Sequence, residues 1–259
     1  MDGRRLTTRA SGEAIALARV FRAPRAGLRV LMYHAVGSPA LGDEKGIFGI
    51  APDLFEAHMA ALARYENATV TTVSSEHPGD SLMKVVITFD DGYGDNLHTA
   101  APILERYSFP FTVFAVSEFV RKNASGFLSA AELRSLSARP GVTIGSHGAS
   151  HIHLTQCEDK ALKDELMSSK HYLEDIIGKP VSSLAYPYGA VNRKVRDAAE
   201  NAGYSLGFTS HFDINGPKRD PLLLARVTVL GIDCVRVFEQ KLHGDWDWYQ
   251  WRARDPAAL

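Results

Sequence analysis

Residues 84–94, with the sequence KVVITFDDGYG, decide our interpretation of the fold. The first six residues are mostly apolar and β-branched, a pattern typical of a strand that is buried on both faces. The strand ends at Asp90, Asp91 and Gly92, where polar residues begin. In (β/α) barrels the chemistry lies at the carboxyl ends of the strands. This segment therefore predicts a buried strand and also the place to look for a functional site.

Strands and helices alternate on both sides of this segment. A capping box, Ser or Thr followed three residues later by Glu, predicts helix starts at Ser129 and at Thr155. The expected strands are 28–32, 84–89, 111–116, 142–144, 183–186, 205–208 and 226–229. The other expected helices are 52–65, 97–107, 193–202 and 234–242, and the helix from Thr155 is the longest and ends at Gly178.

This alternation favours a single sheet of parallel strands covered by helices. The chain shows no repeat, low-complexity tract or linker, and no G-x-G-x-x-G follows an early strand, which disfavours a dinucleotide-binding fold. We expect an α/β protein, a single-domain distorted (β/α) barrel with seven or eight units. The barrel is expected to cover residues 28–245, between an N-terminal arm or helix (1–27) and a C-terminal tail (246–259).

Composition excludes several classes of protein. Of the 259 residues, 45% are apolar and 23% are charged, which is typical of a globular domain and not of a disordered, collagen-like or coiled-coil chain. Lys and Arg total 29 against 30 Asp and Glu, so no basic field predicts a nucleic-acid partner. No apolar run approaches the roughly 18 residues of a membrane span.

The N-terminal residues and the cysteines bear on location. The apolar stretch Ala14–Ala18 is shorter than the apolar core of a secretory signal, so a cytoplasmic location is expected, with export by another route left open. Cys157 and Cys234 are too few for a disulfide framework, and both are expected to be reduced, buried thiols.

The first candidate site is the pair Asp90 and Asp91. Two adjacent carboxylates on a sharp turn repel each other, and a cation bound by one of them would offset this repulsion. The neighbouring carboxylate would then remain free as a base. The alternative is an ordinary solvated Asp-Asp-Gly turn.

The second candidate site is the histidine-rich stretch 145–153. His147 and His151 can converge on one metal, and one carboxylate would complete a set of three ligands with an open position for water. His153 is a substitute ligand or, more simply, a surface group. The alternative is a polar loop with incidental histidines.

Three further residues are candidates at strand ends. In residues 184–189, Pro and Gly make a rigid loop that leaves the Tyr188 N–H to face a ligand and stabilise an oxyanion. His34 ends the first strand, where it can act as a general acid. Arg226 is a charge within a strand pattern and needs a carboxylate partner, for which Asp90 is suitable. Each residue also has an ordinary structural interpretation.

The remaining aromatic and histidine residues form no such group. The tail 246–251 contains three Trp and a Tyr that can stack on sugar rings, although packing or a subunit contact is favoured. We expect the other histidines to be structural: His58, His77, His98, His171, His211 and His243.

Together these motifs resemble the polysaccharide deacetylase family, the NodB-type carbohydrate esterases. The motif T-F-D-D-G is intact at Thr88–Gly92, and H-[ST]-x-x-H is present at His147–His151 with Gly148 in place of the usual Ser or Thr. A third motif is similar to Ala185–Gly189. The resemblance spans about residues 28–242.

The start of the chain is similar to one branch of this family. Val30–His34 (VLMYH) resembles the exopolysaccharide poly-N-acetylglucosamine deacetylases, in which the motif order is permuted and the acid histidine comes early. The arginine that usually precedes the third motif is replaced by Leu184 and Ala185, and Arg226 is the candidate replacement. The later motif with a leaving-group histidine is not recognisable, and His243 matches it weakly.

The resemblance implies a distorted (β/α) barrel that holds a divalent metal on Asp91, His147 and His151. Zinc suits these ligands, and nickel, cobalt or iron also fit them. The implied roles are base for Asp90, with Arg226 bracing it, oxyanion donor for the Tyr188 N–H, and leaving-group acid for His34.

The implied activity is metal-dependent hydrolysis of N-acetyl groups on amino sugars or polysaccharide, which releases acetate and a free amine. One alternative is a related barrel hydrolase that cuts the C–N bond of a small non-sugar amide. Another is a catalytically silent carbohydrate-binding protein. The expected partner is thus an N-acetylated sugar, with no nucleic acid and no membrane span.

Overall fold

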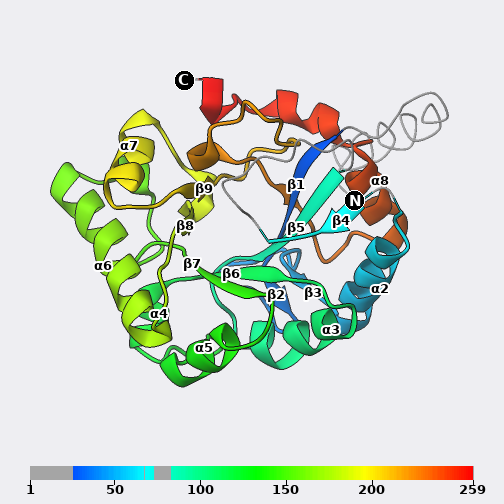
Figure 1. Cartoon of the computed structure of the whole chain (residues 1–259), viewed down its shortest axis with the longest axis horizontal. Coiled ribbons are helices and arrows are strands. Elements are labelled where there is room, and N and C mark those ends of the chain that lie inside the picture. Colours follow the sequence, from blue (N-terminus) through cyan, green and yellow to red (C-terminus); the bar gives the residue numbers. More distant parts are fainter. Residues whose placement is uncertain (1–25, 67, 73–82, 259) are drawn as a thin grey trace.

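The structure of the chain is a computed structural model, and it describes residues 26–66, 68–72 and 83–258. Seven parallel strands lie in the order β10-β1-β5-β6-β7-β8-β9, with helices around the outside (Figure 1). The strands are β1 (Gly27–Tyr33), β5 (Met83–Phe89), β6 (Phe111–Ala115), β7 (Val142–Ser146), β8 (Ser183–Ala185), β9 (Leu206–Phe208) and β10 (Val227–Thr228). The predicted α/β fold, a distorted (β/α) barrel, is confirmed, with seven strands along this path.

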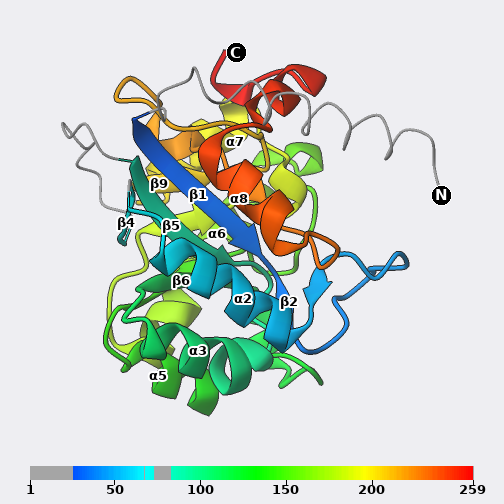
Figure 2. The ribbon, with the colours of Figure 1, turned by 90° about the vertical axis from the view of Figure 1, so that its right-hand side faces the viewer.

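Three short strands were not expected. β4 (Ala68–Val70) pairs with the first half of β5, on the edge that β6 occupies further along. β2 (Ala35–Val36) and β3 (Gly49–Ile50) form a separate parallel pair. The connection between β2 and β3 projects at the carboxyl end of β1 (Figure 2).

Seven α-helices are described. They are α2 (Pro52–Ala63), α3 (Ala101–Arg106), α4 (Ser117–Arg121), α5 (Ala130–Ser137), α6 (Asp159–Ile177), α7 (Arg193–Asn201) and α8 (Val235–His243). Short 3-10 helices cover Leu154–Gln156, Pro187–Gly189, Pro221–Leu223, Asp247–Arg252 and Pro256–Ala258. Within the described ranges, none of these helices combines the length and apolar character needed to cross a membrane.

Alternation along the strands separates two apolar layers. Leu31 and Tyr33 of β1 pack outward in the larger core beneath the helices, whereas Leu28 and Val30 face the barrel interior. The interior cluster consists of Leu28, Val30, Val86, Phe114, Ala185, Leu206, Phe208 and Leu224. Side chains along a strand alternate between its two faces, so His34, the residue after β1, lies on the same inward side as Leu28 and Val30.

Gly145 in β7 makes room for the Phe114 ring in this interior. A Cβ at residue 145 would lie 2.4 Å from Cδ1 of Phe114 and 2.7 Å from the Ser183 hydroxyl. Glycine therefore lets the Phe114 ring fill the middle of the barrel, which is too narrow for side chains at both positions.

The segment before β10 nearly closes the barrel. The Leu224 N–H donates to the Gly207 carbonyl, and the Thr209 N–H donates back to the Leu224 carbonyl, each at 2.8 Å. The Arg226 N–H donates to the His211 carbonyl. These bonds hold residues 224–226 beside β9 and direct the Arg226 side chain into the barrel.

The longest helix begins later than expected. α6 starts at Asp159, its N-cap residue Glu158 makes no side-chain capping bond, and residues 154–156 form a separate 3-10 turn. The buried Leu154 side chain anchors this turn, and Cys157 and Glu158 are extended, so a helix cannot start at Thr155. The prediction of a capping box at Thr155 is therefore wrong, whereas the capping box predicted at Ser129 is present.

Other expectations have mixed outcomes. Cys157 is half-buried and Cys234 exposed, so the expectation of two buried thiols is wrong, although both are free.

In the tail, Trp246 is buried and donates to Gln240, whereas Trp251 is 81% exposed. His77 lies outside the described residues, as does the N-terminal arm apart from its last two residues.

Candidate active site

Three potential metal ligands meet at the carboxyl ends of β5 and β7. The Nε2 atoms of His147 and His151 lie 3.5 Å and 3.3 Å from Oδ1 of Asp91. The ligand atoms of all three residues lie within 4.8 Å of one another. Asp91 and His147 are buried, and His151 is partly exposed toward the pocket.

The backbone reaches this arrangement through unusual conformations. Asp91 has φ of 70° and His151 has φ of 57°, both in the left-handed region that residues with a Cβ rarely adopt. Such strain persists only where the surroundings hold it, and it gathers at functional sites. The left-handed turn at Asp91 separates its side chain from that of Asp90.

The chemistry of the three residues fits a divalent cation. The His147 Nδ1 lies 2.8 Å from the Ala185 carbonyl, which only accepts, so Nδ1 carries the proton and a neutral His147 turns its Nε2 lone pair toward Asp91. Two acceptors facing each other at 3.5 Å repel, and a cation between them removes the repulsion. Tetrahedral bonds of about 2.1 Å place ligand atoms roughly 3.4 Å apart, close to both distances.

The His151 ring is also suited to ligation. Burial, and next the neighbouring His147, lower the pKa of His151, which favours the neutral imidazole that binds metals. Its ring lies 5.0 Å from that of His147, at 52°. Both histidines therefore offer a free ring nitrogen at the same point.

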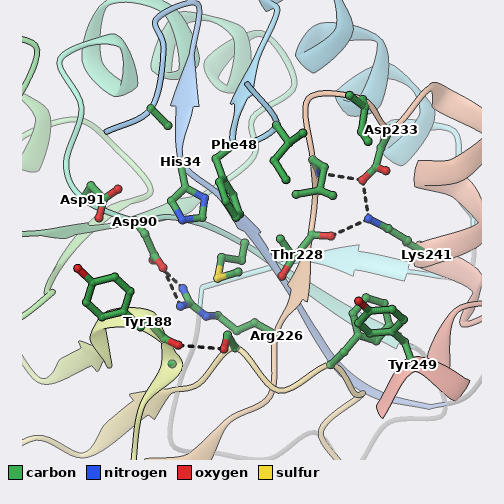
Figure 3. Close-up of a pocket in the computed structure, with 18 of the residues that line it drawn as sticks. His34, Phe48, Asp90, Asp91, Tyr188, Arg226, Thr228, Asp233, Lys241 and Tyr249 are labelled. Atoms are coloured by element: carbon green, nitrogen blue, oxygen red, sulfur yellow. Dashed lines mark hydrogen bonds and ion pairs between the residues drawn. The ribbon is translucent and has the colours of Figure 1, made fainter. Parts of the chain in front are cut away.

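Asp90 has a different environment. Its two carboxylate oxygens each accept a hydrogen bond of 2.7 Å from the Arg226 guanidinium (Figure 3). The Arg226 Nε donates to the Thr209 carbonyl. Burial alone would raise the pKa of Asp90, but the charge and the hydrogen bonds of the Arg226 guanidinium hold it well below its usual value. Asp90 therefore stays ionised, with a carboxylate oxygen 4.0 Å from His147 Nε2.

His34 lines the same pocket, near Asp90 (Figure 3). The Phe48 ring packs 4.9 Å from the His34 ring, and the buried Asn96 donates its amide N–H to the His34 carbonyl. Burial lowers the pKa of His34, and its buried Nδ1 has no hydrogen-bond partner among the described residues. The imidazole is thus free to meet a ligand.

Tyr188 lies beside the ligands, and its ring is 57% exposed at the pocket mouth. Its backbone is left-handed, with φ of 61°. The ring packs 4.6 Å from that of His151 and is stacked at 4.1 Å on His153. His153 therefore supports the Tyr188 ring and does not join the three ligand residues.

These residues share one pocket with a volume of about 1230 Å³. It contains all seven residues proposed from the sequence: His34, Asp90, Asp91, His147, His151, Tyr188 and Arg226. Its mouth is rimmed by the exposed side chains of Leu41, Tyr188 and Ile232. The pocket continues past Thr228 toward Tyr249 of the tail.

The other described histidines do not line this pocket. His243 lies at the end of α8, where its Nδ1 contacts the Glu239 carbonyl, so it does not provide the acid of the weakly matching motif. His98 pairs with Glu132 on the surface, and His58 is buried against Phe238.

Several residues that support the site carry no direct signal in the sequence. Phe48 and Asn96 act on His34 from segments that carry no motif. Glu165 of α6 binds the backbone between the two ligand histidines. The one hint was Gly148, which has no side chain to hold that loop.

Comparisons with known proteins agree with this geometry. A family model described as polysaccharide deacetylase matches residues 80–207. YxkH of Bacillus subtilis is 28% identical over 192 residues, which cover 71% of this chain and 65% of YxkH. The deacetylase PplD of Streptococcus pyogenes, solved in complex with acetate, has the same fold, with a TM-score of 0.74 at 23% identity over 85% of this chain and 99% of that chain.

Two further relatives have names that state a substrate. The peptidoglycan-N-acetylglucosamine deacetylase of Bacillus cereus is 28% identical over 145 residues, which cover 55% of this chain and 63% of the relative. The poly-beta-1,6-N-acetyl-D-glucosamine N-deacetylase of Staphylococcus epidermidis is 27% identical over 158 residues, 56% of this chain and 54% of the relative. This chain therefore spans 54% to 65% of the length of the three relatives.

Proposed function

This chain contains a polysaccharide deacetylase family domain, and from that premise we propose that the protein removes N-acetyl groups from a polymer of N-acetylated amino sugars by metal-dependent hydrolysis. The observation that carries the proposal is the meeting of Asp91, His147 and His151 beside the Asp90–Arg226 pair in one pocket. The products would be acetate and a free amine on the sugar.

The three ligand residues would hold a divalent cation, for which zinc is our first choice. When bound, such a cation polarises the acetamide carbonyl and lowers the pKa of the attacking water. The His147 Nδ1–H bond to the Ala185 carbonyl fixes the ring so that Nε2 faces the cation.

Asp90 would accept a proton from the attacking water. Arg226 keeps this carboxylate ionised and fixes both of its oxygens, so the base is always unprotonated and correctly oriented. The same ion pair weakens the basicity of Asp90, which is why acidification of the water is also required.

Two further groups would complete the reaction. The Tyr188 N–H would donate to the developing oxyanion from a rigid, left-handed position in the loop. His34 would protonate the departing amine, since its unpartnered ring nitrogen lines the same pocket.

The shape of the pocket favours a polymer over a small amide. Its volume of about 1230 Å³ exceeds the roughly 300–1,000 Å³ typical of small-molecule sites. Exposed Leu41, Tyr188 and Ile232 at the mouth suit the apolar faces of sugar rings. The names of two relatives point to polymers that contain N-acetylglucosamine.

The test is to measure acetate release from N-acetylglucosamine oligomers and from a panel of small amides, with metal content measured on the same samples. We expect the protein to release acetate from the oligomers. A chelator should abolish this activity, and added zinc should restore it. His147→Ala should lose metal and activity together, because two remaining ligands bind weakly. His171→Ala, which removes an exposed histidine of α6, is the matched control.

Two results would replace this proposal with another. Metal-loaded protein that hydrolyses small amides but not oligomers would indicate a small-amide hydrolase. Metal-loaded protein that binds oligomers and hydrolyses neither substrate would indicate a carbohydrate-binding protein.

A further inference from the structure

The loop between the two ligand histidines consists of Gly148, Ala149 and Ser150, and α6 holds it. Gly148 contributes no side chain and has φ of 76°, where a residue with a Cβ would be strained. The loop must nevertheless place His151 in its own left-handed conformation. Groups outside the loop therefore have to supply the constraint.

Glu165 of α6 supplies most of the constraint on this loop. Its Oε2 accepts the backbone N–H of Ala149 at 2.9 Å and that of Ser150 at 3.0 Å. Its other oxygen, Oε1, accepts the Ser150 hydroxyl. One carboxylate thus binds three donors of two consecutive residues, and such charge-assisted hydrogen bonds are stronger than neutral ones.

Neutral groups bind the rest of the loop. The Ser146 hydroxyl accepts the Gly148 N–H, and the Ser169 hydroxyl donates to the Gly148 carbonyl. At the start of α4, the backbone N–H groups of Ser117 and Glu118 donate to the carbonyls of residues 148 and 149. Ser169, Ser117 and Glu118 therefore hold the loop carbonyls, whereas Ser146 binds the N–H of Gly148 and Glu165 binds those of Ala149 and Ser150.

We propose that Glu165 is a positioning residue for the metal site, whose carboxylate clamps the loop so that His151 meets Asp91 and His147. This inference rests on the metal site of the proposed function. A left-handed conformation is unfavourable for a residue with a Cβ such as His151, whose φ is 57°. Without the clamp, the loop would relax toward ordinary backbone conformations and withdraw His151 Nε2 from its position 3.3 Å from Asp91.

The test compares Glu165→Ala, Glu165→Gln and Asp164→Ala for zinc affinity and for thermal unfolding of the metal-free protein. Asp164 is the preceding, exposed residue of α6, so its removal changes the charge of the same helix without touching the loop. Zinc affinity is measured by competition with a chromogenic chelator, in the absence of substrate.

We expect Glu165→Ala to raise the zinc Kd about tenfold, within the range for residues that orient metal ligands. Glu165→Gln should stay within about threefold of wild type, because both loop N–H groups bind the same oxygen and an amide oxygen can replace it. Asp164→Ala should leave the Kd unchanged.

The outcomes separate the possible roles. If Glu165→Ala lowers only the melting temperature of the metal-free protein and keeps the wild-type zinc Kd, Glu165 is merely structural and the inference fails. Equal losses of zinc affinity in Glu165→Ala and Asp164→Ala would show that Glu165 acts only through the net charge of α6. That result would also overturn the inference. Wild-type protein that binds no zinc would instead overturn the proposed function itself.

Discussion

Asp90 and Asp91 are neighbours with the same side chain, and their surroundings differ. Asp90 continues the inward alternation of β5 and meets Arg226, whereas the left-handed backbone of Asp91 turns its carboxylate toward the two histidines. In the proposed function, a single peptide unit would thus divide two roles, base and metal ligand, between chemically identical groups.

Exchange of each carboxylate for an amide should separate these roles. We expect Asp90→Asn to keep its metal, because the three ligands are untouched, while kcat falls by roughly 10²–10⁴, the usual contribution of a positioned base. Asp91→Asn should lose metal affinity, and excess zinc should partly restore its rate. Metal content and kcat are measured for both variants on the same oligomer. A metal-free Asp90→Asn beside a loaded Asp91→Asn would show that the roles are reversed.

The role of His34 can be tested through the leaving group. An amine needs a proton as it departs, whereas an activated aryl ester releases a stable phenolate. We expect His34→Ala to keep its metal, to lose most of its activity on the acetamide, and to lose much less on an aryl acetate. Equal losses of kcat/KM on both substrates would mean that His34 is not the leaving-group acid.

At the scale of elements, the two capping-box sequences had different outcomes. In α5 the Ser129 hydroxyl accepts the Glu132 N–H, and the Glu132 carboxylate accepts the Ser129 N–H. The bonds from Ser129 and His98 lower the pKa of Glu132 to about 2. Thr155 has the same spacing to Glu158 but lies within the 3-10 turn Leu154–Gln156, so it does not precede a helix N-terminus that it could cap.

Removal of each hydroxyl measures this difference. We expect Ser129→Ala to lower the free energy of unfolding by about 1 kcal/mol, the usual value of an N-cap. Thr155→Ala should change it by less than about 0.5 kcal/mol, as expected for a residue without such a role. Urea unfolding of both variants provides the measurement. A larger loss in Thr155→Ala than in Ser129→Ala would contradict the observed start of α6.

At the scale of the whole molecule, His58 connects α2 with β1 and with the segment before α8. Its Nε2 lies 2.8 Å from the Asp233 carbonyl and therefore donates, and its Nδ1 lies 3.3 Å from the Tyr33 hydroxyl. The ring stacks on Phe238 at 4.3 Å. Burial is the main cause that lowers the pKa of His58 to about 4, so this side chain is neutral in the folded protein near pH 7.

The free energy of unfolding should therefore depend on pH through His58. Between pH 6.5 and 4 the unfolded chain binds a proton that the folded protein does not, so stability falls as pH is lowered through this window. The expected loss from this group is about 3 kcal/mol. His58→Gln, which keeps polar atoms but does not titrate, should show a weaker pH dependence in urea unfolding between pH 7 and pH 4.

The exposed residue His171 provides the control for that measurement. His171→Gln makes the same substitution on the exposed surface of α6, so it shows what the loss of a histidine outside the core does. If His58→Gln loses as much stability as wild type between pH 7 and pH 4, His58 does not titrate as its burial implies.

The sequence by itself determined the seven barrel strands, most of the helices, and the clusters of polar residues at the strand ends. Each of these is a local property: β-branched runs make strands wherever they are buried, and a strand end places its next residues at the mouth of the barrel. For that reason Asp90, Asp91, His147 and His34 were recognisable as candidates without coordinates.

Only the tertiary structure decided how these groups meet. Arg226 is 136 positions from Asp90, and the closure of residues 224–226 against β9 brings its guanidinium within 2.7 Å of both carboxylate oxygens. Phe48 over His34 and Glu165 beneath the ligand loop carry no local signal, because each contact depends on how distant elements pack. The sequence pattern of a strand or helix indicates which face a residue occupies. Which distant residues that face contacts is decided only when the barrel packs.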